Sequence, residues 1–440
     1  MNVLKNFGYK TLKLLPAAAL LVAFTARAPL SAEVETPESQ ESIESLESLV
    51  EEALRNNPEI KAERARWEAS TKRPSQEGAL PNPTIGVRFK NVGLTDITQG
   101  EDPRTDIQAF MSQEIPFPGK LSLKAEVARE QSEAQRWIYD VVARRVKADL
   151  KVAYHDWFLA SKSIEITLKN KDLIGKFLKI AEVKYSVGEG IQQDVLKAQV
   201  ELSRFIEQLE LLGEKKGIEE AKLRSILNRP PDSPLGEPEE VEKSLFILTE
   251  DEIYALTQEK APLLKSKERL IESKKRGLDL AKKQYFPDFI VQATYFNRDG
   301  GDGNLSDLWQ VGLEMKVPLY FWRKEKFGVD EAVSRLQAAR EDYSSANQSL
   351  FFVVKDHFLV LKTSENLLEL FEQGLIPQAS LSLESAIAGY RVGNIDFLTL
   401  LDNLITLFNF ELTYYTYLTN YQNALARIEE VIGIDITGDK

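Results

Sequence analysis

The spacing of apolar and polar residues predicts long helices separated by glycine breaks. No proline occurs between Pro118 and Pro230, so helical patterning can run without interruption from Lys120 to about Val187. Such a helix would be about 100 Å long. A Gly188-Glu189-Gly190 break follows, and a return helix is predicted from Ile191 to about Asn228. A helix of this length must lie against similar helices, because no globular core could cover it.

Strict alternation of apolar and polar residues predicts four strands. Trp309, Val311, Leu313, Met315 and Val317 alternate with polar residues or glycine. The predicted strands are residues 84–92, 105–115, 289–297 and 309–317. Each is long enough to cross a bilayer when tilted. Alternation of this kind also suits a half-buried hairpin in a soluble domain.

The chain contains an internal repeat. Four pairs of short segments match in order at offsets of 206, 202, 200 and 205 residues. They are Leu80-Pro81-Asn82 with Phe286-Pro287-Asp288, Ile115-Pro116 with Val317-Pro318, Phe158-Leu159 with Phe358-Leu359, and Tyr185-Ser186-Val187-Gly188 with Tyr390-Arg391-Val392-Gly393. This order indicates duplication of a large module.

Each repeat is predicted to contain a helix, two strands and a long helical hairpin. Residues 46–228 form the first repeat, with an opening helix over 46–78 and a hairpin tip over 185–194. The proline-rich residues 229–240 form a linker. Residues 241–440 form the second repeat, with a long helix from about Arg323, a tip over 390–402 and a return helix to about Ile432. Pro377, with Gly374 before it, must kink or divide that long helix.

The two return helices carry heptad repeats, which indicate packing between supercoiled helices. The heptad positions are Val195, Leu202 and Leu209 with Ala198, Phe205 and Leu212 in the first, and Leu400, Leu407, Tyr414, Tyr421 and Ile428 with Asn403, Phe410, Tyr417, Ala424 and Val431 in the second.

The first residues have the pattern of a secretory signal. Lys5, Lys10 and Lys13 precede an apolar stretch of 11 residues, and small residues follow. We therefore assign residues 1–32 to a signal peptide cut after Ala28 or Ala32, and residues 33–45 to an acidic leader. The protein is predicted to be exported.

Composition excludes several classes of protein. The chain has no cysteine, which rules out disulfides, thiolate metal sites and lipid attachment through an N-terminal cysteine. Its net charge of -12 argues against nucleic-acid binding. The segment Phe397 to Leu418 is the best further candidate for a membrane helix, but Asp402 and Glu411 make it unsuitable. If the protein meets a membrane, it must do so as a β-barrel.

Four strands cannot close a barrel, so copies of the chain must share one. Two copies would give eight strands with an interior filled by side chains. Three copies would give twelve strands, an even number as outer-membrane barrels prefer, and room for a channel. The prediction is a homotrimer.

No residues with the pattern of a catalytic or metal site stand out. His155 and His357 are isolated on predicted helices, and the segment Asp299 to Asn304 lacks the spacing of a calcium loop. The tyrosines Tyr414, Tyr415, Tyr417 and Tyr421 have helical spacing and are predicted to pack in a core. We expect no enzyme, no metal and no cofactor.

In these features the sequence resembles the TolC family of outer-membrane efflux proteins, from about Leu46 to Ile432. The residues that carry the resemblance are Leu49–Ile60 with Asn57-Pro58, Ala79-Leu80-Pro81-Asn82-Pro83, Ser112-Gln113-Glu114-Ile115-Pro116 with Gly119-Lys120, and the tyrosines Tyr185 and Tyr390 at the tips. The turn containing Gly119-Lys120 is most similar to the branch that exports metal cations.

The resemblance implies a mainly α-helical homotrimer with a membrane β part. A 12-stranded β-barrel in the outer membrane would continue into a 12-helix tunnel in the periplasm. It also implies two partners, a periplasmic adaptor protein and an inner-membrane pump, and the candidate type for the pump is resistance-nodulation-division. The cargo would be metal cations or small toxic compounds.

The resemblance also identifies candidate residues at the periplasmic entrance. Asp402 matches a family carboxylate, whereas Thr399 and Ile395 replace a family carboxylate and arginine, so one acidic ring is expected. Asp194 matches a residue that links neighbouring helices, Tyr390 is the tip tyrosine of the second repeat, and Asp396 would add negative charge near that tip. The tip residues implied in adaptor docking are Val187, Gly188, Arg391, Val392 and Gly393.

A second interpretation remains open at this point. A soluble periplasmic coiled-coil scaffold or adaptor without a channel would share the long helices. Such a scaffold does not need four segments that alternate apolar and polar residues over the thickness of a bilayer. The four predicted strands therefore distinguish the channel from the scaffold.

Overall fold

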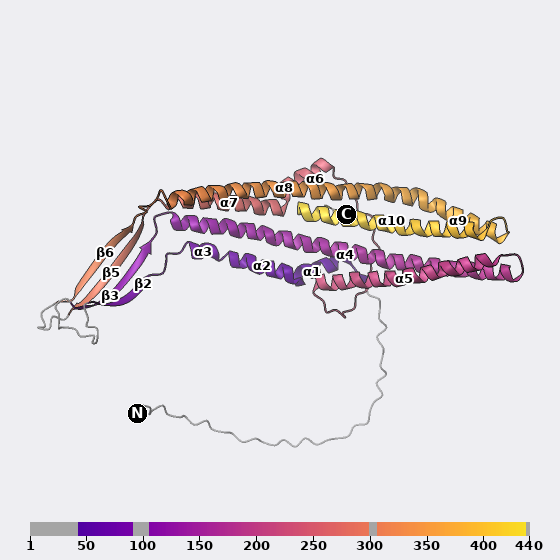
Figure 1. Cartoon of the computed structure of the whole chain (residues 1–440), viewed down its shortest axis with the longest axis horizontal. Helices are drawn as coiled ribbons and strands as arrows, with labels where there is room; N and C mark the ends of the chain where they lie inside the picture. Colours follow the sequence, from indigo (N-terminus) through magenta and orange to yellow (C-terminus); the bar gives the residue numbers. More distant parts are fainter. Residues whose placement is uncertain (1–42, 91–104, 299–305, 437–440) are drawn as a thin grey trace, which may run out of the picture. The chain divides into compact units, whose positions relative to one another are not determined.

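Long helices lie side by side through most of the chain, and a four-stranded sheet lies at one end of them (Figure 1). The computed structural model describes residues 43–90, 105–298 and 306–436, which belong to one unit spanning Glu41–Lys440. The predicted signal peptide over 1–32, nearly all of the acidic leader, the end of the first predicted strand and the Asp299–Asn304 loop lie outside the described residues.

The first repeat begins with three short helices, so the prediction of one helix over 46–78 is wrong. The helices are α1 (Leu46–Asn56), α2 (Pro58–Ser70) and α3 (Arg73–Glu77). Asn57 separates the first two, because its side-chain oxygen accepts hydrogen bonds from Glu59 N at 2.9 Å and Ile60 N at 3.3 Å and so caps α2. Pro58 occupies the first helical position, where no amide hydrogen is needed.

The rest of the first repeat follows the predicted order closely. It consists of β2 (Thr84–Lys90), β3 (Asp106–Ile115), α4 (Lys120–Ser186) and α5 (Gln192–Leu227). The second repeat contains α6 (Glu250–Lys260), α7 (Pro262–Lys283), β5 (Asp288–Arg298), β6 (Leu308–Lys316), α8 (Glu325–Leu370), a π-helical segment η1 (Phe371–Leu375), α9 (Ile376–Arg391) and α10 (Phe397–Ile432). The division of the long helix before Pro377 is confirmed.

The strands form one antiparallel sheet in the order β2-β3-β5-β6. Residues paired across neighbouring strands point to the same face, and the apolar residues of each strand pair mostly with apolar residues of the next. One face of the sheet is therefore apolar. Its side chains include Ile85, Val87 and Phe89 of β2, Ile107, Ala109 and Met111 of β3, Phe289, Val291, Ala293 and Tyr295 of β5, and Trp309, Val311, Leu313 and Met315 of β6. The opposite face is mostly polar. The outer edges of β2 and β6 have no strand partner among the described residues.

The core lies between the helices of the two repeats. One cluster joins Phe177 and Ala181 of α4 and Phe205 of α5 to Leu404 and Phe408 of α10. The heptad positions are buried or half-buried, and the buried stripe of α10 is wider than a heptad, since it also includes Leu401, Leu418 and Leu425. The four predicted core tyrosines pack in a second cluster. Among the described residues, no helix combines the length and apolar character needed to cross a membrane.

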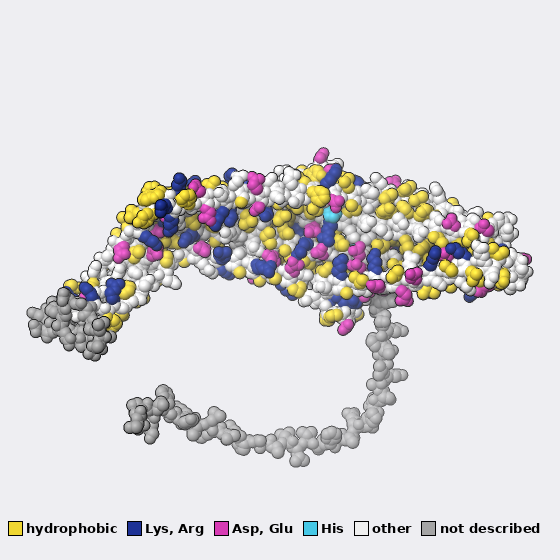
Figure 2. Space-filling view, viewed as in Figure 1, with side chains coloured by type: hydrophobic (Ala, Val, Ile, Leu, Met, Phe, Trp, Pro, Cys, Tyr) yellow, Lys and Arg dark blue, Asp and Glu magenta, His cyan; other side chains and the backbone are white. Residues whose placement is uncertain are grey.

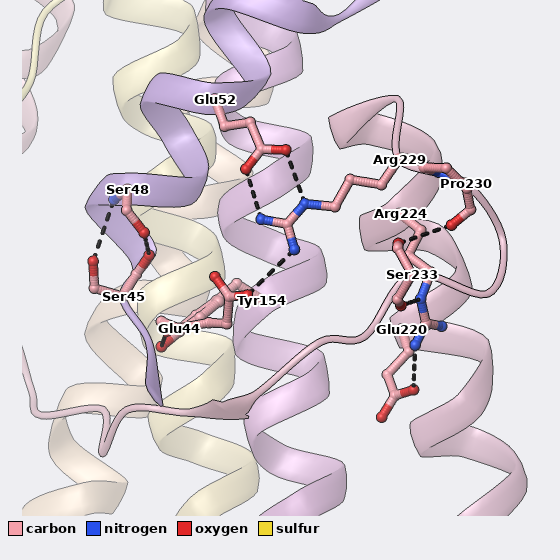
Figure 3. A network of polar contacts seen from close by, with 10 residues as sticks. All are labelled: Glu44, Ser45, Ser48, Glu52, Tyr154, Glu220, Arg224, Arg229, Pro230 and Ser233. Carbon is pink, nitrogen blue, oxygen red and sulfur yellow. Dashed lines mark hydrogen bonds and ion pairs between the residues drawn. The ribbon is translucent and has the colours of Figure 1, made fainter. Parts of the chain in front are cut away.

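The linker after α5 is fastened to the N-terminal part of the first repeat (Figure 3). Arg229 donates to both oxygens of Glu52 at 2.8 and 2.6 Å, and to Glu44 Oε1 at 3.2 Å. The hydrogen-bonded Arg229 guanidinium lowers the pKa of Glu52. Two short strands, β1 (Ile43–Glu44) and β4 (Glu237–Pro238), pair in parallel beside this contact. The Tyr154 hydroxyl donates to Glu44 O at 3.0 Å and accepts from Glu239 N at 2.9 Å.

Candidate entrance site at the helical tips

The two helical hairpins close through equivalent turns. Gly188 and Gly393 have φ angles of +80° and +79°, a conformation that glycine adopts without strain. In the first tip Glu189 N donates to Lys184 O at 2.9 Å, and in the second Asn394 N donates to Gly389 O at 2.9 Å. Each bond satisfies a carbonyl at a helix end, as in a Schellman motif. The sequence match at the tips therefore reflects a shared backbone geometry.

Lys184 connects the first hairpin to the second. Its ammonium group donates to Tyr390 O at 2.7 Å and lies 4.3 Å from the centroid of the Tyr390 ring. Tyr390 is buried, and its ring meets that of Phe397 at 5.6 Å. Sequence reasoning missed Lys184. Its place beside Tyr185 was visible, but its contact with Tyr390 depends on the register between the two hairpins, which the sequence does not reveal.

Three of the predicted residues share one electrostatic neighbourhood. Burial raises the pKa of Asp194, the charge of Asp396 raises it further, and Lys184 lowers it. Burial and the charge of Asp194 raise the pKa of Tyr390. Asp396 caps α10 by accepting from Thr399 N at 2.7 Å, and this hydrogen bond lowers the pKa of Asp396. The structure thus brings Asp194, Tyr390 and Asp396 together, with Thr399 attached through the cap.

Asp402 is exposed on α10, and it is not among the groups that shift the pKa values of Asp194, Tyr390 and Asp396. The next residue, Asn403, donates to Thr399 O at 2.7 Å and accepts from Ser382 Oγ at 2.5 Å, which ties α10 to α9. Within the described ranges the Asp402 carboxylate forms no hydrogen bond or ion pair, so its charge is available to solvent or to another molecule.

The outermost residues of both tips are open to solvent. Val187 and Val392 are 64% and 70% exposed, although both are apolar. Gly188, Arg391 and Gly393 are exposed as well. Two exposed valines at matching positions are a small apolar surface that a partner protein could cover.

His155, considered in the sequence as an isolated histidine, lies in the packed interior of the helices. His155 is buried, its Nδ1 lies 3.0 Å from Asn423 Oδ1, and burial lowers its pKa to about 4. A cavity of about 620 Å³ beside it is lined by residues from α1, α4, α10 and the linker. Lys151 and Glu429, which line that cavity, are paired with each other. No group of three or more His, Asp or Glu residues in the described part of the chain could hold a metal ion.

Two equivalent halves, each with two strands and a helical hairpin, define a class of channel-forming envelope proteins, and comparisons identify the family. A model described as "Outer membrane efflux protein" matches residues 49–229 and 253–434. The chain belongs to this family. It is an outer-membrane efflux channel, with its helical part in the periplasm, and a component of a tripartite efflux system. The family consists of channels and not of enzymes, and this assignment excludes the soluble scaffold.

Individual relatives are distant in sequence. The cobalt-zinc-cadmium resistance protein CzcC of Cupriavidus metallidurans is 19% identical over 364 residues, which cover 81% of this chain and 82% of that protein. The structure of CusC is similar with a TM-score of 0.76 and 16% identity, covering 88% of this chain and 92% of that chain. The outer-membrane protein VceC of Vibrio cholerae has a TM-score of 0.75 and 17% identity, covering 89% and 96%.

Proposed function

We propose that three copies of the chain form one continuous duct, with a 12-stranded β-barrel in the outer membrane and a 12-helix tunnel in the periplasm. The observation that supports this most directly is the sheet, which has an apolar face in all four strands and two unpaired edges. Trp309, Val311 and Leu313 on that face are more than 70% exposed. Lipid satisfies no backbone hydrogen bonds, so the free edges of β2 and β6 must pair with other copies.

Cysteine cross-linking tests the trimer, since the chain has no cysteine of its own. One cysteine is introduced at Ile85, Val87 or Phe89 on β2, and a second at Val311, Leu313 or Met315 on β6. We expect at least one pair to give a covalent trimer on a denaturing gel, whereas each single cysteine gives at most a dimer. A chain that remains monomeric in mild detergent and forms no cross-linked species would refute the assembly.

The tips would form the periplasmic entrance, narrowed by one ring of three Asp402 carboxylates. Support comes from the exposure of Asp402 and from its lack of an ion-pair partner within the described residues. Three carboxylates around a narrow opening attract cations and repel anions. Ile395 and Thr399 carry no charge, so the link between hairpins rests on Lys184, Tyr390 and Asp194 and is less ionic than a carboxylate–arginine latch.

Channel recordings test the acidic ring. Asp402→Ala is expected to raise single-channel conductance and to weaken block by a trivalent cation such as hexamminecobalt. Asp232→Ala removes an exposed carboxylate from the linker and is the matched control, expected to leave both properties unchanged. Unchanged block in Asp402→Ala would show that Asp402 does not line the entrance.

The exposed residues at both tips would receive a periplasmic adaptor that connects the duct to an inner-membrane pump. A photo-cross-linking amino acid at Val187 or Val392 should capture the adaptor in cells, with mass spectrometry identifying it. The same amino acid at Asp232 is the control. Capture at Asp232 alone would place the docking surface elsewhere.

Metal cations are the cargo class that we favour. The acidic entrance suits cations, and one relative is named as a cobalt-zinc-cadmium resistance protein. Loss of the gene should then increase sensitivity to divalent transition metals, and the wild-type gene should restore resistance. Increased sensitivity to small organic toxins alone would indicate the second cargo class.

A further inference from the structure

Exposed aromatic side chains gather in the turn that follows β6. Tyr320 is 69% and Trp322 is 53% exposed, although both are large rings. The rings touch one another, with Phe321 and Trp322 centroids 5.3 Å apart and Tyr320 and Trp322 centroids 5.9 Å apart. We call Leu319–Trp322 the aromatic turn. Figure 2 shows hydrophobic side chains at this junction of strands and helices, with lysine and arginine beside them.

Three unpaired cations follow the aromatic turn directly. Arg323, Lys324 and Lys326 are all exposed, and within the described residues their side chains form no ion pair or hydrogen bond. Glu325 is the one acidic residue among them, so the segment has a net positive charge. An unneutralised group of this kind favours an anionic partner.

The corresponding turn of the first repeat is built differently. Lys120 is 3% exposed, and its ammonium group donates to Asp288 Oδ1 at 2.8 Å and to Phe286 O at 2.9 Å. Phe117 stacks on Phe286 with centroids 4.5 Å apart. The cation and ring of this turn stabilise the junction between sheet and helix. In the second repeat the three cations are exposed and have no such internal role. Phe321 contacts the Tyr285 ring at 6.2 Å, whereas the ring contacts of Tyr320 and Trp322 in the described residues are with other members of the aromatic turn.

The order of residues along the chain matches the layers of a bilayer surface. The apolar face of β6 comes first, then the aromatic turn, then the cations. Hydrocarbon, the interfacial region and the phosphates follow one another in the same order, and aromatic rings prefer the middle layer. The helices that follow are periplasmic, so this boundary faces the periplasmic leaflet.

We propose that residues 319–326 bind anionic phospholipid headgroups at the periplasmic surface of the outer membrane. Arg323, Lys324 and Lys326 hold the phosphate, and the rings of the aromatic turn lie at the level of the glycerol backbone. This inference rests on the proposal that the sheet is embedded in the membrane. A second copy of the same turn is a poor occupant, because it presents the same three positive charges.

Tryptophan fluorescence can report on both the embedding and the lipid preference. Trp322→Phe leaves Trp309 as the reporter inside the sheet, and Trp309→Phe leaves Trp322 as the reporter at the turn. Each protein is reconstituted in phosphatidylcholine bilayers containing a small fraction of brominated phosphatidylglycerol or of brominated phosphatidylcholine. Bromine quenches a nearby indole, so the ratio of quenching by the two lipids measures local enrichment. The other three tryptophans, on the helices, give a constant background.

We expect phosphatidylglycerol to be enriched at least roughly fivefold around Trp322, the factor that a single cation near an anionic surface contributes, and less around Trp309. The variant Arg323→Gln/Lys324→Gln/Lys326→Gln should lose the preference. The control Lys61→Gln/Lys179→Gln/Lys215→Gln removes three exposed, unpaired charges from α2, α4 and α5 and should retain it. Raising the salt concentration should weaken the preference by screening.

Each contrary outcome has a distinct meaning. Quenching of Trp309 with equal quenching of Trp322 by both lipids would overturn the inference and leave the embedded sheet intact. Quenching of Trp309 with a shielded Trp322 would indicate a protein partner at the turn and would also overturn it. Absence of quenching at both positions would overturn the inference together with the proposed barrel.

Discussion

Two glycines that end helices differ in what surrounds them. Gly393 has a φ of +79°, and a Cβ added there would meet nothing within 4 Å, whereas at Gly433 the φ is +85° and a Cβ would lie 2.7 Å from Pro262 Cδ. We expect Gly393→Ala to lower the free energy of unfolding by about 1 kcal/mol, because alanine is strained in this left-handed backbone conformation. Gly433→Ala should cost at least about 2 kcal/mol more, because α7 must also shift. Urea unfolding in detergent measures both, and equal costs would contradict the expected crowding.

His155 should make the protein sensitive to acid. Burial lowers its folded pKa to about 4 from 6.5, so the unfolded chain binds more protons between these values. The stability it contributes is therefore present above pH 6.5 and is lost as pH falls toward 4, by about 3 kcal/mol in total. Lys151, Glu429 and Asn423 surround the ring.

Thermal unfolding from pH 7 to pH 4.5 checks this contribution. His155→Gln should flatten the fall of melting temperature with pH. His357→Gln is the control, since His357 is only half-buried and should change the profile less. A profile of His155→Gln that parallels the wild type would contradict a proton-linked role.

At the scale of the elements, Lys184 holds the two hairpins together. Lys184→Met keeps the aliphatic stem but removes the hydrogen bond to Tyr390 O and the contact with its ring. We expect the interaction between the two hairpins to weaken by roughly 1–3 kcal/mol. Channel recordings should then show a higher open probability. Lys179→Met removes an exposed, unpaired charge five residues earlier and should leave gating unchanged. Identical gating in both variants would show that Lys184 does not restrain the tips.

Patterning predicted some elements better than others, and the reason is physical. The helix Lys120–Ser186 and the strands of the second repeat agree with the prediction within one or two residues, because proline, glycine and strict alternation mark their limits. The breaks within residues 46–78 were missed, since they depend on side-chain caps such as that of Asn57. The parallel pair β1 and β4 was missed because two residues carry no periodicity.

The entrance residues show the same limit. Asp194, Tyr390 and Asp396 were identified through resemblance, and the structure brings them together. Lys184 was not, because its function depends on the distance between hairpins that lie 206 residues apart in sequence. The role of Asp402 stays a prediction, since it concerns a neighbouring copy.

At the scale of the whole molecule, Arg229 joins the linker between repeats to the N-terminal segment. Arg229→Met removes two hydrogen bonds to Glu52 and one to Glu44, all partly shielded from water. We expect the free energy of unfolding to fall by an amount on the order of 2 kcal/mol, and proteolysis within residues 229–240 to become faster. Arg55→Met breaks a fully exposed pair with Glu51 and should cost less than about 0.5 kcal/mol. Equal protease resistance of the Arg229 variant and the wild type would contradict this role.

The two tips share a backbone turn but carry different side chains. Glu189 follows the glycine of one tip, and Arg391 precedes that of the other. A ring of identical binding proteins that met both kinds of tip would encounter opposite charges at alternate places. Such a ring must either grip the main chain and valines common to both, or use two separate modes of attachment. Duplication within one chain thus sets the rules for whatever assembles on it.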